Sequence, residues 1–397
     1  MSQNAIHSVA FKTNVANAKQ IKERDSIRVK HVQAGHQPHG PAARHHKHHE
    51  PCGPSGSVTC IPVTNASVTY LADVCMGDNS KACNLLIDTG SSNTWVKKEC
   101  YKPTSASTDT REKFSIQYGQ GATSGTIYKD TVTMGSLVIK DQLIGVADNA
   151  TDMDNIDGIL GIGPCCLTEG TTSDNTPIPT VTDNCLNQRL IANACIGIYY
   201  EPTATDNDSN GKTGCLSFGG PDISKCTSEI NYVPITKTDP ACKYWGIDQS
   251  ICYNGNEIMA NCAGIADTGT TMCMLPESTF QTYKEEVGAK LDPNTGLLTV
   301  TQKQFECMQD MCFKIGGKEY KLTPDAQTWP RSQNENLGVP KNAICLIFAS
   351  MGQMENKGLD FINGYTFLQR FYSVYDTGNM QVGFATTKHT TSTSNQV

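Results

Sequence analysis

A short segment occurs twice in this sequence, and the distance between its copies constrains the fold more than any other feature. Leu85-Leu-Ile-Asp-Thr-Gly-Ser-Ser is echoed by Gly264-Ile-Ala-Asp-Thr-Gly-Thr-Thr, which places Asp88 and Asp267 179 residues apart. That spacing is too long for a solenoid, whose repeats are usually about 20–50 residues long. The echo therefore predicts a duplicated lobe, with two similar domains facing each other across a cleft.

The sequence between and around these copies favours β structure. Short apolar runs bounded by Gly or Asn read as strands, and helical spacing is convincing only in short pieces such as Ser278–Leu291. We expect an all-β, bilobal fold with two pseudo-symmetric β lobes around a cleft. The expected lobes are residues 57–198 and 199–390, and the polar residues after Ala385 are expected to fray.

Residues 1–56 differ in charge from the rest of the chain. They hold eight Lys or Arg and three Asp or Glu, a net charge of +5, within a chain whose overall charge is −7. The acidic remainder argues against a nucleic-acid partner, because phosphate contacts need clustered basic side chains. A basic leader on an acidic body predicts electrostatic association between the two. No apolar stretch approaches the roughly 18 residues that a membrane span needs.

The 18 cysteines include no C-x-x-C pair, so a zinc ribbon or thioredoxin-type redox site is not expected. A dispersed, even set is typical of disulfides formed in an oxidising compartment, although buried free thiols are the alternative. Sequons at Asn65, Asn149 and Asn207 favour a secreted glycoprotein. We expect a secreted protein, with a vacuole or another acidic compartment as the alternative.

Each Asp-Thr-Gly segment is an apolar strand ending in a turn. The Gly permits close backbone approach, and the neighbouring hydroxyls and amides can hydrogen-bond a carboxylate. If pseudo-symmetry brings Asp88 and Asp267 together, two like charges cannot both ionise easily, so the pair shares one proton. One member then acts as a base toward water while the other acts as an acid, and the pKa values belong to the pair.

The positions of the histidines exclude other hydrolytic sites. Eight of the nine lie in residues 1–49 and the ninth is His389. A Ser-His-Asp or Cys-His hydrolase built between residues 57 and 388 would lack its general base, and a His-ligated zinc site would lack its ligands. We therefore expect no metal and no cofactor.

Together these segments resemble the pepsin-like aspartic peptidase family over about residues 57–386. Asp88-Thr-Gly-Ser-Ser-Asn-Thr-Trp-Val and Asp267-Thr-Gly-Thr-Thr resemble its two active-site motifs, and Phe114-Ser-Ile-Gln-Tyr-Gly-Gln-Gly resembles its flap. Ile156-Asp-Gly-Ile-Leu-Gly-Ile-Gly and Phe361-Ile-Asn-Gly-Tyr-Thr-Phe-Leu resemble the strands that thread beside each active Asp. Stretches such as Tyr244-Trp-Gly-Ile-Asp-Gln-Ser-Ile resemble the fungal polyporopepsin branch.

The resemblance implies a pepsin-like fold, an acid-acting aspartic endopeptidase, and a role for each matched residue. Asp88 and Asp267 would be catalytic. Tyr118 and Gly119 would lie in the flap, with Trp95 bonding to the tyrosine. Supporting residues would brace the loops, bond the outer carboxylate oxygens and allow the turns; they are Thr89, Gly90, Ser91, Thr268, Gly269 and Thr270.

Other implications concern the leader and the cysteines. Residues 1–56 resemble a basic zymogen pro-segment, with a disordered tail or a metal-chelating His tract as alternatives. Cys345 would pair with Cys307 or Cys312. Asn363 departs from the family, which commonly has an aliphatic residue there.

The expected partners are protein or peptide substrates and inhibitors such as pepstatin, with no nucleic acid and no membrane, and the chain is expected to be a monomer. The alternative function is a catalytically inactive binding or inhibitor protein on the same fold. Loss of either Asp would favour that alternative, but both motifs are intact.

Overall fold

The computed structural model describes residues 18–33, 59–65, 70–77, 82–118, 121–151, 153, 156–202, 214–352 and 357–393. Several sequence-based predictions lie outside these residues, among them the role of Gly119, the sequon at Asn207 and the His tract at residues 45–49.

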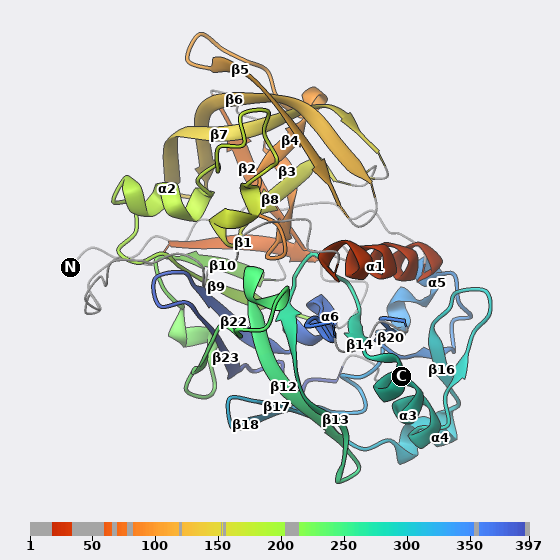
Figure 1. Cartoon of the computed structure of the whole chain (residues 1–397). Coiled ribbons are helices and arrows are strands. Elements are labelled where there is room, and N and C mark those ends of the chain that lie inside the picture. The colour runs from red at the N-terminus through yellow and green to blue at the C-terminus, as the bar shows by residue number, and fades with distance from the viewer. Residues whose placement is uncertain are drawn as a thin grey trace.

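A 13-stranded sheet runs through the molecule in the order β11-β23-β22-β9-β10-β1-β2-β3-β8-β4-β7-β6-β5 (Figure 1). It joins strands from the first half of the chain to four strands that lie wholly in the second half. Its strands are β1 (Thr59–Asn65), β2 (Tyr70–Met76), β3 (Cys83–Asp88), β4 (Trp95–Lys97), β5 (Thr108–Gln117), β6 (Ala122–Met134), β7 (Leu137–Ala150), β8 (Gly158–Gly161), β9 (Cys195–Tyr200), β10 (Gly214–Phe218), β11 (Asn231–Pro234), β22 (Phe371–Asp376) and β23 (Gln381–Thr386).

Two smaller sheets build the second lobe, in the orders β18-β17-β12-β13-β21-β14-β20 and β15-β16-β19. Their strands are β12 (Gly246–Tyr253), β13 (Asn256–Ala266), β14 (Cys273–Leu275), β15 (Lys290–Leu291), β16 (Leu298–Val300), β17 (Met311–Ile315), β18 (Lys318–Leu322), β19 (Ile344–Cys345), β20 (Phe348–Ser350) and β21 (Phe361–Asn363). The architecture is therefore mostly β and bilobal, as the sequence predicts.

The helices are short apart from the first. They are α1 (Ala18–Gln33), α2 (Val181–Asn187), α3 (Glu277–Glu286), α4 (Gln302–Cys307), α5 (Asn334–Leu337) and α6 (Tyr365–Leu368). The helix predicted over Ser278–Leu291 ends earlier, because Gly288 adopts the left-handed φ of +67° that commonly follows a helix end. None of the helices in the described ranges is long and apolar enough to cross a membrane.

Burial follows the position of each strand. Buried and more exposed residues mostly alternate along β6, as expected when one face of a strand meets the core. Every residue of β9 and β22 is buried. These two strands pair with each other in the 13-stranded sheet, and their apolar side chains bury both faces between the lobes.

The C-terminal segment corrects one expectation. Residues after Ala385 do not fray at once, because Thr387 and Thr390 are buried. The hydroxyl of Thr390 donates to the Arg370 carbonyl at 2.6 Å, and Nη1 of Arg370 donates to the Ser392 carbonyl at 2.6 Å. A buried arginine thus fixes the final turn.

The predicted pairing of Cys345 is also not found. Cys345 is buried on β19 with a free thiol, and the thiols of Cys307 and Cys312 are free as well. Cys312 instead lies opposite Cys252 in the pairing of β12 with β17. Among the described cysteines, Cys215 is disulfide-bonded.

Candidate active site

The two predicted aspartates lie at the ends of corresponding strands. Asp88 is the last residue of β3, and Asp267 follows β13 directly; both side chains are fully buried. The turn after Asp88 holds its carboxylate from two sides. The Gly90 amide donates to Oδ1 at 2.9 Å, and the Ser91 hydroxyl donates to Oδ2 at 2.5 Å.

The second turn repeats this arrangement around Asp267. The Gly269 amide donates to Oδ1 at 3.0 Å, and the Thr270 hydroxyl donates to Oδ2 at 2.6 Å. Each carboxylate therefore has one oxygen bonded to a hydroxyl and one bonded to a glycine amide.

Two threonines connect the turns. The Thr89 amide donates to Oγ1 of Thr268 at 3.0 Å, and the Thr268 amide donates to Oγ1 of Thr89 at 2.9 Å. Each hydroxyl also donates to a carbonyl of the other lobe, Thr89 to Ala266 at 3.1 Å and Thr268 to Ile87 at 2.8 Å. This reciprocal brace fixes the two aspartates relative to each other.

Glycine is required in both turns because the loops approach closely. A Cβ on Gly90 would lie 2.6 Å from Oδ1 of Asp267, and a Cβ on Gly269 would collide with Oδ1 of Asp88. Any other residue would push the carboxylates apart.

One strand threads beside each aspartate, as the sequence predicts. β8 runs parallel to β3 and β21 runs parallel to β13. In the first lobe the Ile162 amide donates to the Asp88 carbonyl at 2.9 Å. In the second lobe the Asp267 amide donates to the Asn363 carbonyl at 3.1 Å.

The predicted flap is a hairpin made by β5 and β6. Tyr118 follows β5, and its hydroxyl accepts a hydrogen bond from Nε1 of Trp95 at 2.7 Å. Burial, reinforced by the charge of Asp88, raises the pKa of Tyr118, so the phenol stays protonated and can donate.

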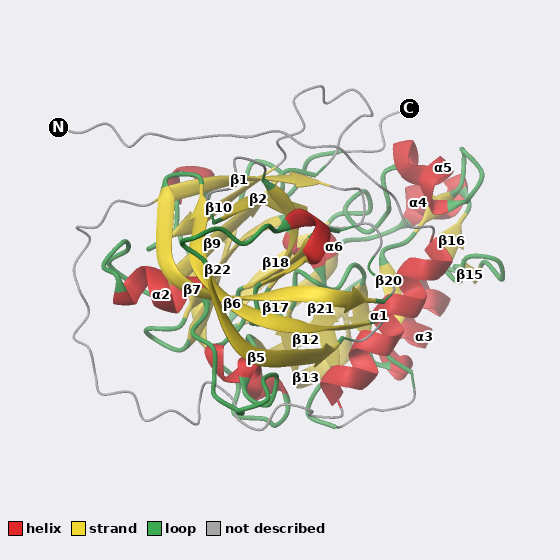
Figure 2. Cartoon of the chain, turned by 90° about the horizontal axis from the view of Figure 1, so that it is seen from above, coloured by secondary structure: helices red, strands yellow, loops and turns green. Residues whose placement is uncertain are grey.

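Helix α1 lies across the front of the site between the lobes (Figures 1 and 2). Its buried residues are Ala18, Ile21, Asp25, Val29 and Val32. These residues recur at intervals close to the helical period, so they form one face. The helix therefore packs against the body through a mostly apolar stripe that contains one acidic side chain.

Arg28 of α1 contacts both catalytic candidates. Its Nη2 lies 2.5 Å from Oδ1 of Asp88 and 2.9 Å from Oδ1 of Asp267, and its Nε lies 2.6 Å from Oδ2 of Asp267. Burial alone would lower the pKa of Arg28, but the two carboxylates outweigh it and raise that pKa. The guanidinium is a fixed positive charge at the centre of the site.

Burial acts in the opposite direction on the carboxyls. It raises the pKa of Asp267, and the nearby charge of Asp88 raises it further, while Arg28 lowers it. Asp25 of α1 is also buried, and its carboxylate accepts from the amides of Thr271 at 3.1 Å and Met272 at 2.7 Å. Burial nevertheless raises the pKa of Asp25 to about 6.

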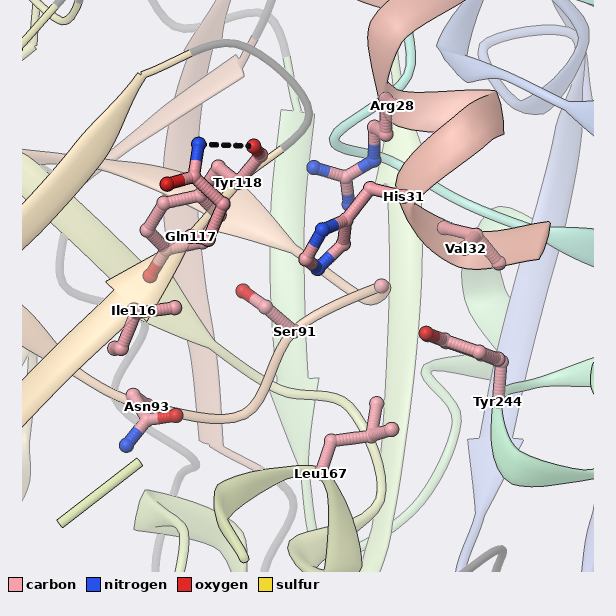
Figure 3. Close-up of a pocket in the computed structure, with 11 residues that line it drawn as sticks. Arg28, His31, Val32, Ser91, Asn93, Ile116, Gln117, Tyr118, Leu167 and Tyr244 are labelled. Carbon is pink, nitrogen blue, oxygen red and sulfur yellow. Dashed lines mark hydrogen bonds between the residues drawn. The ribbon is translucent and has the colours of Figure 1, made fainter. Parts of the chain in front are cut away.

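A pocket remains between α1 and the flap (Figure 3). Arg28 and His31 point into it from the helix, opposite Ser91 and Tyr118. Its walls come from both lobes and from α1: Arg28, His31, Val32, Gly90, Ser91, Asn93, Ile116, Gln117, Tyr118, Leu167 and Tyr244. Among the described residues, no cluster of three or more His, Cys, Asp or Glu side chains is arranged to hold a metal ion.

Sequence reasoning missed Arg28 and Asp25. The helical spacing of Ile21, Val29 and Val32 is visible in the sequence and could have predicted which face of the helix is buried. Three arginines lie in residues 1–56, and no local motif singles out Arg28 among them. Its role depends on a contact with residues 60 and 239 positions away.

Comparison with known proteins gives the same picture. A family model described as eukaryotic aspartyl protease matches residues 69–387. Polyporopepsin from Irpex lacteus is 48% identical over 339 residues, which cover 84% of this chain and 99% of that protein. Cathepsin D from Dictyostelium discoideum is 32% identical, covering 83% of this chain and 86% of its own length.

A solved structure agrees with these relatives. The crystal structure of an aspartic proteinase from Irpex lacteus superposes with a TM-score of 0.82 at 47% identity, covering 85% of this chain and all of that one. With both Asp-Thr-Gly turns facing each other, this chain is an aspartic endopeptidase and belongs to the eukaryotic aspartyl protease family.

Proposed function

We propose that this chain hydrolyses peptide bonds of proteins at acidic pH through a shared-proton dyad of Asp88 and Asp267, and that it is made as a zymogen. One observation carries the proposal. A single nitrogen, Nη2 of Arg28, lies 2.5 Å from one Oδ1 and 2.9 Å from the other. The carboxylates therefore converge on a position that one water molecule can occupy.

The chemistry follows from that convergence. A water at the position of Nη2 can donate to both Oδ1 atoms, and two adjacent carboxyls of the free enzyme share one proton. The ionised member removes a proton from the water as it attacks the peptide carbonyl, and the protonated member donates to the carbonyl oxygen. The hydroxyls of Ser91 and Thr270 orient the outer oxygens, and the flap with Tyr118 closes over an extended substrate.

Residues 1–56 are proposed to be the inhibitory pro-segment. Arg28 occupies the position of the water, and its ion pairs require both carboxylates to be ionised. Docking of α1 therefore expels the proton that the free dyad shares. By linkage, acidification returns that proton and weakens docking, so acid favours activation.

The remaining proposals concern partners and location. We expect protein substrates, inhibition by pepstatin, no cofactor and a monomeric enzyme. Secretion is supported by the sequons, with an acidic vacuole as the alternative compartment. The alternative of an inactive binding protein has no support from the site, where both carboxylates keep their full set of contacts.

The test is cleavage of a denatured protein at about pH 3–5, where an acid protease dyad holds one proton. We expect cleavage that pepstatin inhibits, and loss of nearly all turnover in Asp88→Asn and in Asp267→Asn. Asp310→Asn, at an exposed position, is the control and should keep wild-type activity. Near-wild-type turnover in either dyad variant would refute the mechanism.

A further inference from the structure

Two amide side chains lie buried in the second lobe without a role in the chemistry described above. Gln249 on β12 and Asn363 on β21 are both fully buried. They bond reciprocally: Nε2 of Gln249 donates to Oδ1 of Asn363 at 3.2 Å, and Nδ2 of Asn363 donates to Oε1 of Gln249 at 2.8 Å. β12 and β21 are the two neighbours of β13 in the sheet, so the pair links the strands on either side of the strand that precedes Asp267.

Asn363 is also joined to the catalytic turn by its backbone. Its carbonyl accepts the Asp267 amide at 3.1 Å. Two residues later, the Tyr365 amide donates to the Thr270 carbonyl at 2.8 Å. An interaction that fixes the position of the Asn363 backbone therefore also fixes the start of the turn that contains Asp267.

The first lobe provides an internal comparison. Gln249 pairs with Cys262 of β13, five residues before Asp267, and Val74 pairs with Cys83 of β3, five residues before Asp88. In the same way, Asn363 pairs with the residue before Asp267, and Leu160 pairs with the residue before Asp88. Val74 and Leu160 therefore occupy, in the first lobe, the positions equivalent to Gln249 and Asn363 in the second. Both are fully buried.

Val74 and Leu160 are apolar, so close packing at these two positions can be achieved without amide side chains. Apolar side chains tolerate small shifts, whereas a reciprocal amide pair satisfies its four hydrogen-bonding groups in only one relative arrangement. Burial increases that constraint, because a shifted amide would have no water to replace its partner.

We infer that the Gln249–Asn363 pair is a positioning element that holds the Asn363 carbonyl under the Asp267 amide and so sets the place of Asp267 relative to Asp88. The inference rests on the proposed dyad mechanism. Neither side chain touches substrate or the reacting atoms. The pair acts through the backbone of β21, and it acts on Asp267 alone.

The test copies the first-lobe pair into the second lobe with the double variant Gln249→Val/Asn363→Leu, studied in the activated enzyme. Each single variant leaves one buried amide without its partner and should lower the melting temperature. The double variant should recover most of that stability. Its kcat should nevertheless stay about 10- to 100-fold below wild type with KM little changed, because small misplacement of a catalytic group costs about that much.

A pH profile separates positioning from packing. In the double variant the two apparent pKa values of the kcat/KM profile should move closer together, because the carboxylates no longer face each other at a fixed separation. Ile362→Val is the matched control, since it changes the buried neighbour of Asn363 without touching the amides, and its profile should be that of wild type. Recovery of stability, kcat and profile together in the double variant would overturn the inference.

A second variant covers the case in which the double variant does not fold. Gln249→Asn/Asn363→Gln exchanges the two side-chain lengths and keeps both amides, so it should retain more activity than either single variant. Activity as low as in the single variants would count against the inference. Failure of the proposed mechanism is distinguishable, because Asp267→Asn would then remain active while the amide variants report only on stability.

Discussion

At the scale of single residues, the site depends on reciprocal contacts between equivalent positions. Thr89 and Thr268 exchange amide-to-hydroxyl bonds, and each hydroxyl reaches a carbonyl of the opposite lobe. All the groups involved are buried, so losing one hydroxyl leaves partners that water cannot reach. We expect the brace to stabilise the fold and to fix the positions of the two aspartates relative to each other.

Thr268→Val tests the brace. It removes the acceptor of the Thr89 amide and the donor to the Ile87 carbonyl, so the free energy of unfolding should fall by about 2–4 kcal/mol. Denaturant unfolding at constant pH measures the change. Thr299→Val, at a partly exposed position of β16, is the control and should cost much less. Equal losses in the two variants would show that the brace contributes little.

The same scale shows what the sequence could and could not predict. Asp88, Asp267 and the flap pair Tyr118 and Trp95 were predictable, because local motifs carry them. Gln249 was not, because its partner is 114 positions away and only the fold brings the two amides together.

At the scale of elements, α1 combines an apolar stripe with a fixed charge on Arg28, whose carboxylate partners titrate, and with Asp25, which titrates itself. Under the zymogen proposal, docking places Arg28 between the ionised carboxylates of Asp88 and Asp267, and protonation of those carboxylates as pH falls favours release of the helix. Asp25 behaves differently, because burial in the docked state raises its pKa to about 6 from an ordinary value near 4. Its contribution to docking is fully present below about pH 4 and is lost as pH rises through about 6. Asp25 therefore opposes acid release over that interval.

The variant Asp25→Asn removes the pH-dependent contribution of Asp25 to docking of α1. The charged groups that face Asp25 are Arg24 and Arg28 on its own helix, with the Tyr365 hydroxyl on α6. The amide does not titrate, so the pH dependence of activation between about pH 4 and 6 should become steeper than in wild type. The measurement is the rate of appearance of activity across that range. A shallower dependence would contradict the assigned pKa shift, and Ser26→Asn on the same helix is the control.

Elements also mark where sequence-based reasoning was incomplete. The strands of both lobes were largely predictable from their apolar runs. The ordered turn after Ala385 could not be predicted. It is held by the buried side chain of Arg370, which donates to the carbonyls of His389 and Ser392, about 20 residues further along the chain. The predicted pairing of Cys345 was wrong. Cys345 is buried on β19 whereas Cys307 is exposed, and strand pairing places Cys312 opposite Cys252.

At the scale of the whole molecule, the 13-stranded sheet fixes the relation between the lobes. It carries strands from both halves of the chain, and β9 and β22 are buried along their full length within it. Nε1 of Trp245 adds a direct link by donating to the Ile162 carbonyl at 3.2 Å. The lobes are thereby held so that two turns far apart in sequence face one point, and that point is occupied by Arg28.

The most direct test of this account is active-site titration of the intact chain with pepstatin near neutral pH. Arg28→Gln should bind the inhibitor stoichiometrically, because the dyad is no longer filled by a guanidinium. Wild type should bind little, and so should Lys30→Gln, which removes an exposed positive charge from the same helix. If the wild-type chain titrates as fully as Arg28→Gln, Arg28 does not block the dyad and the account is wrong.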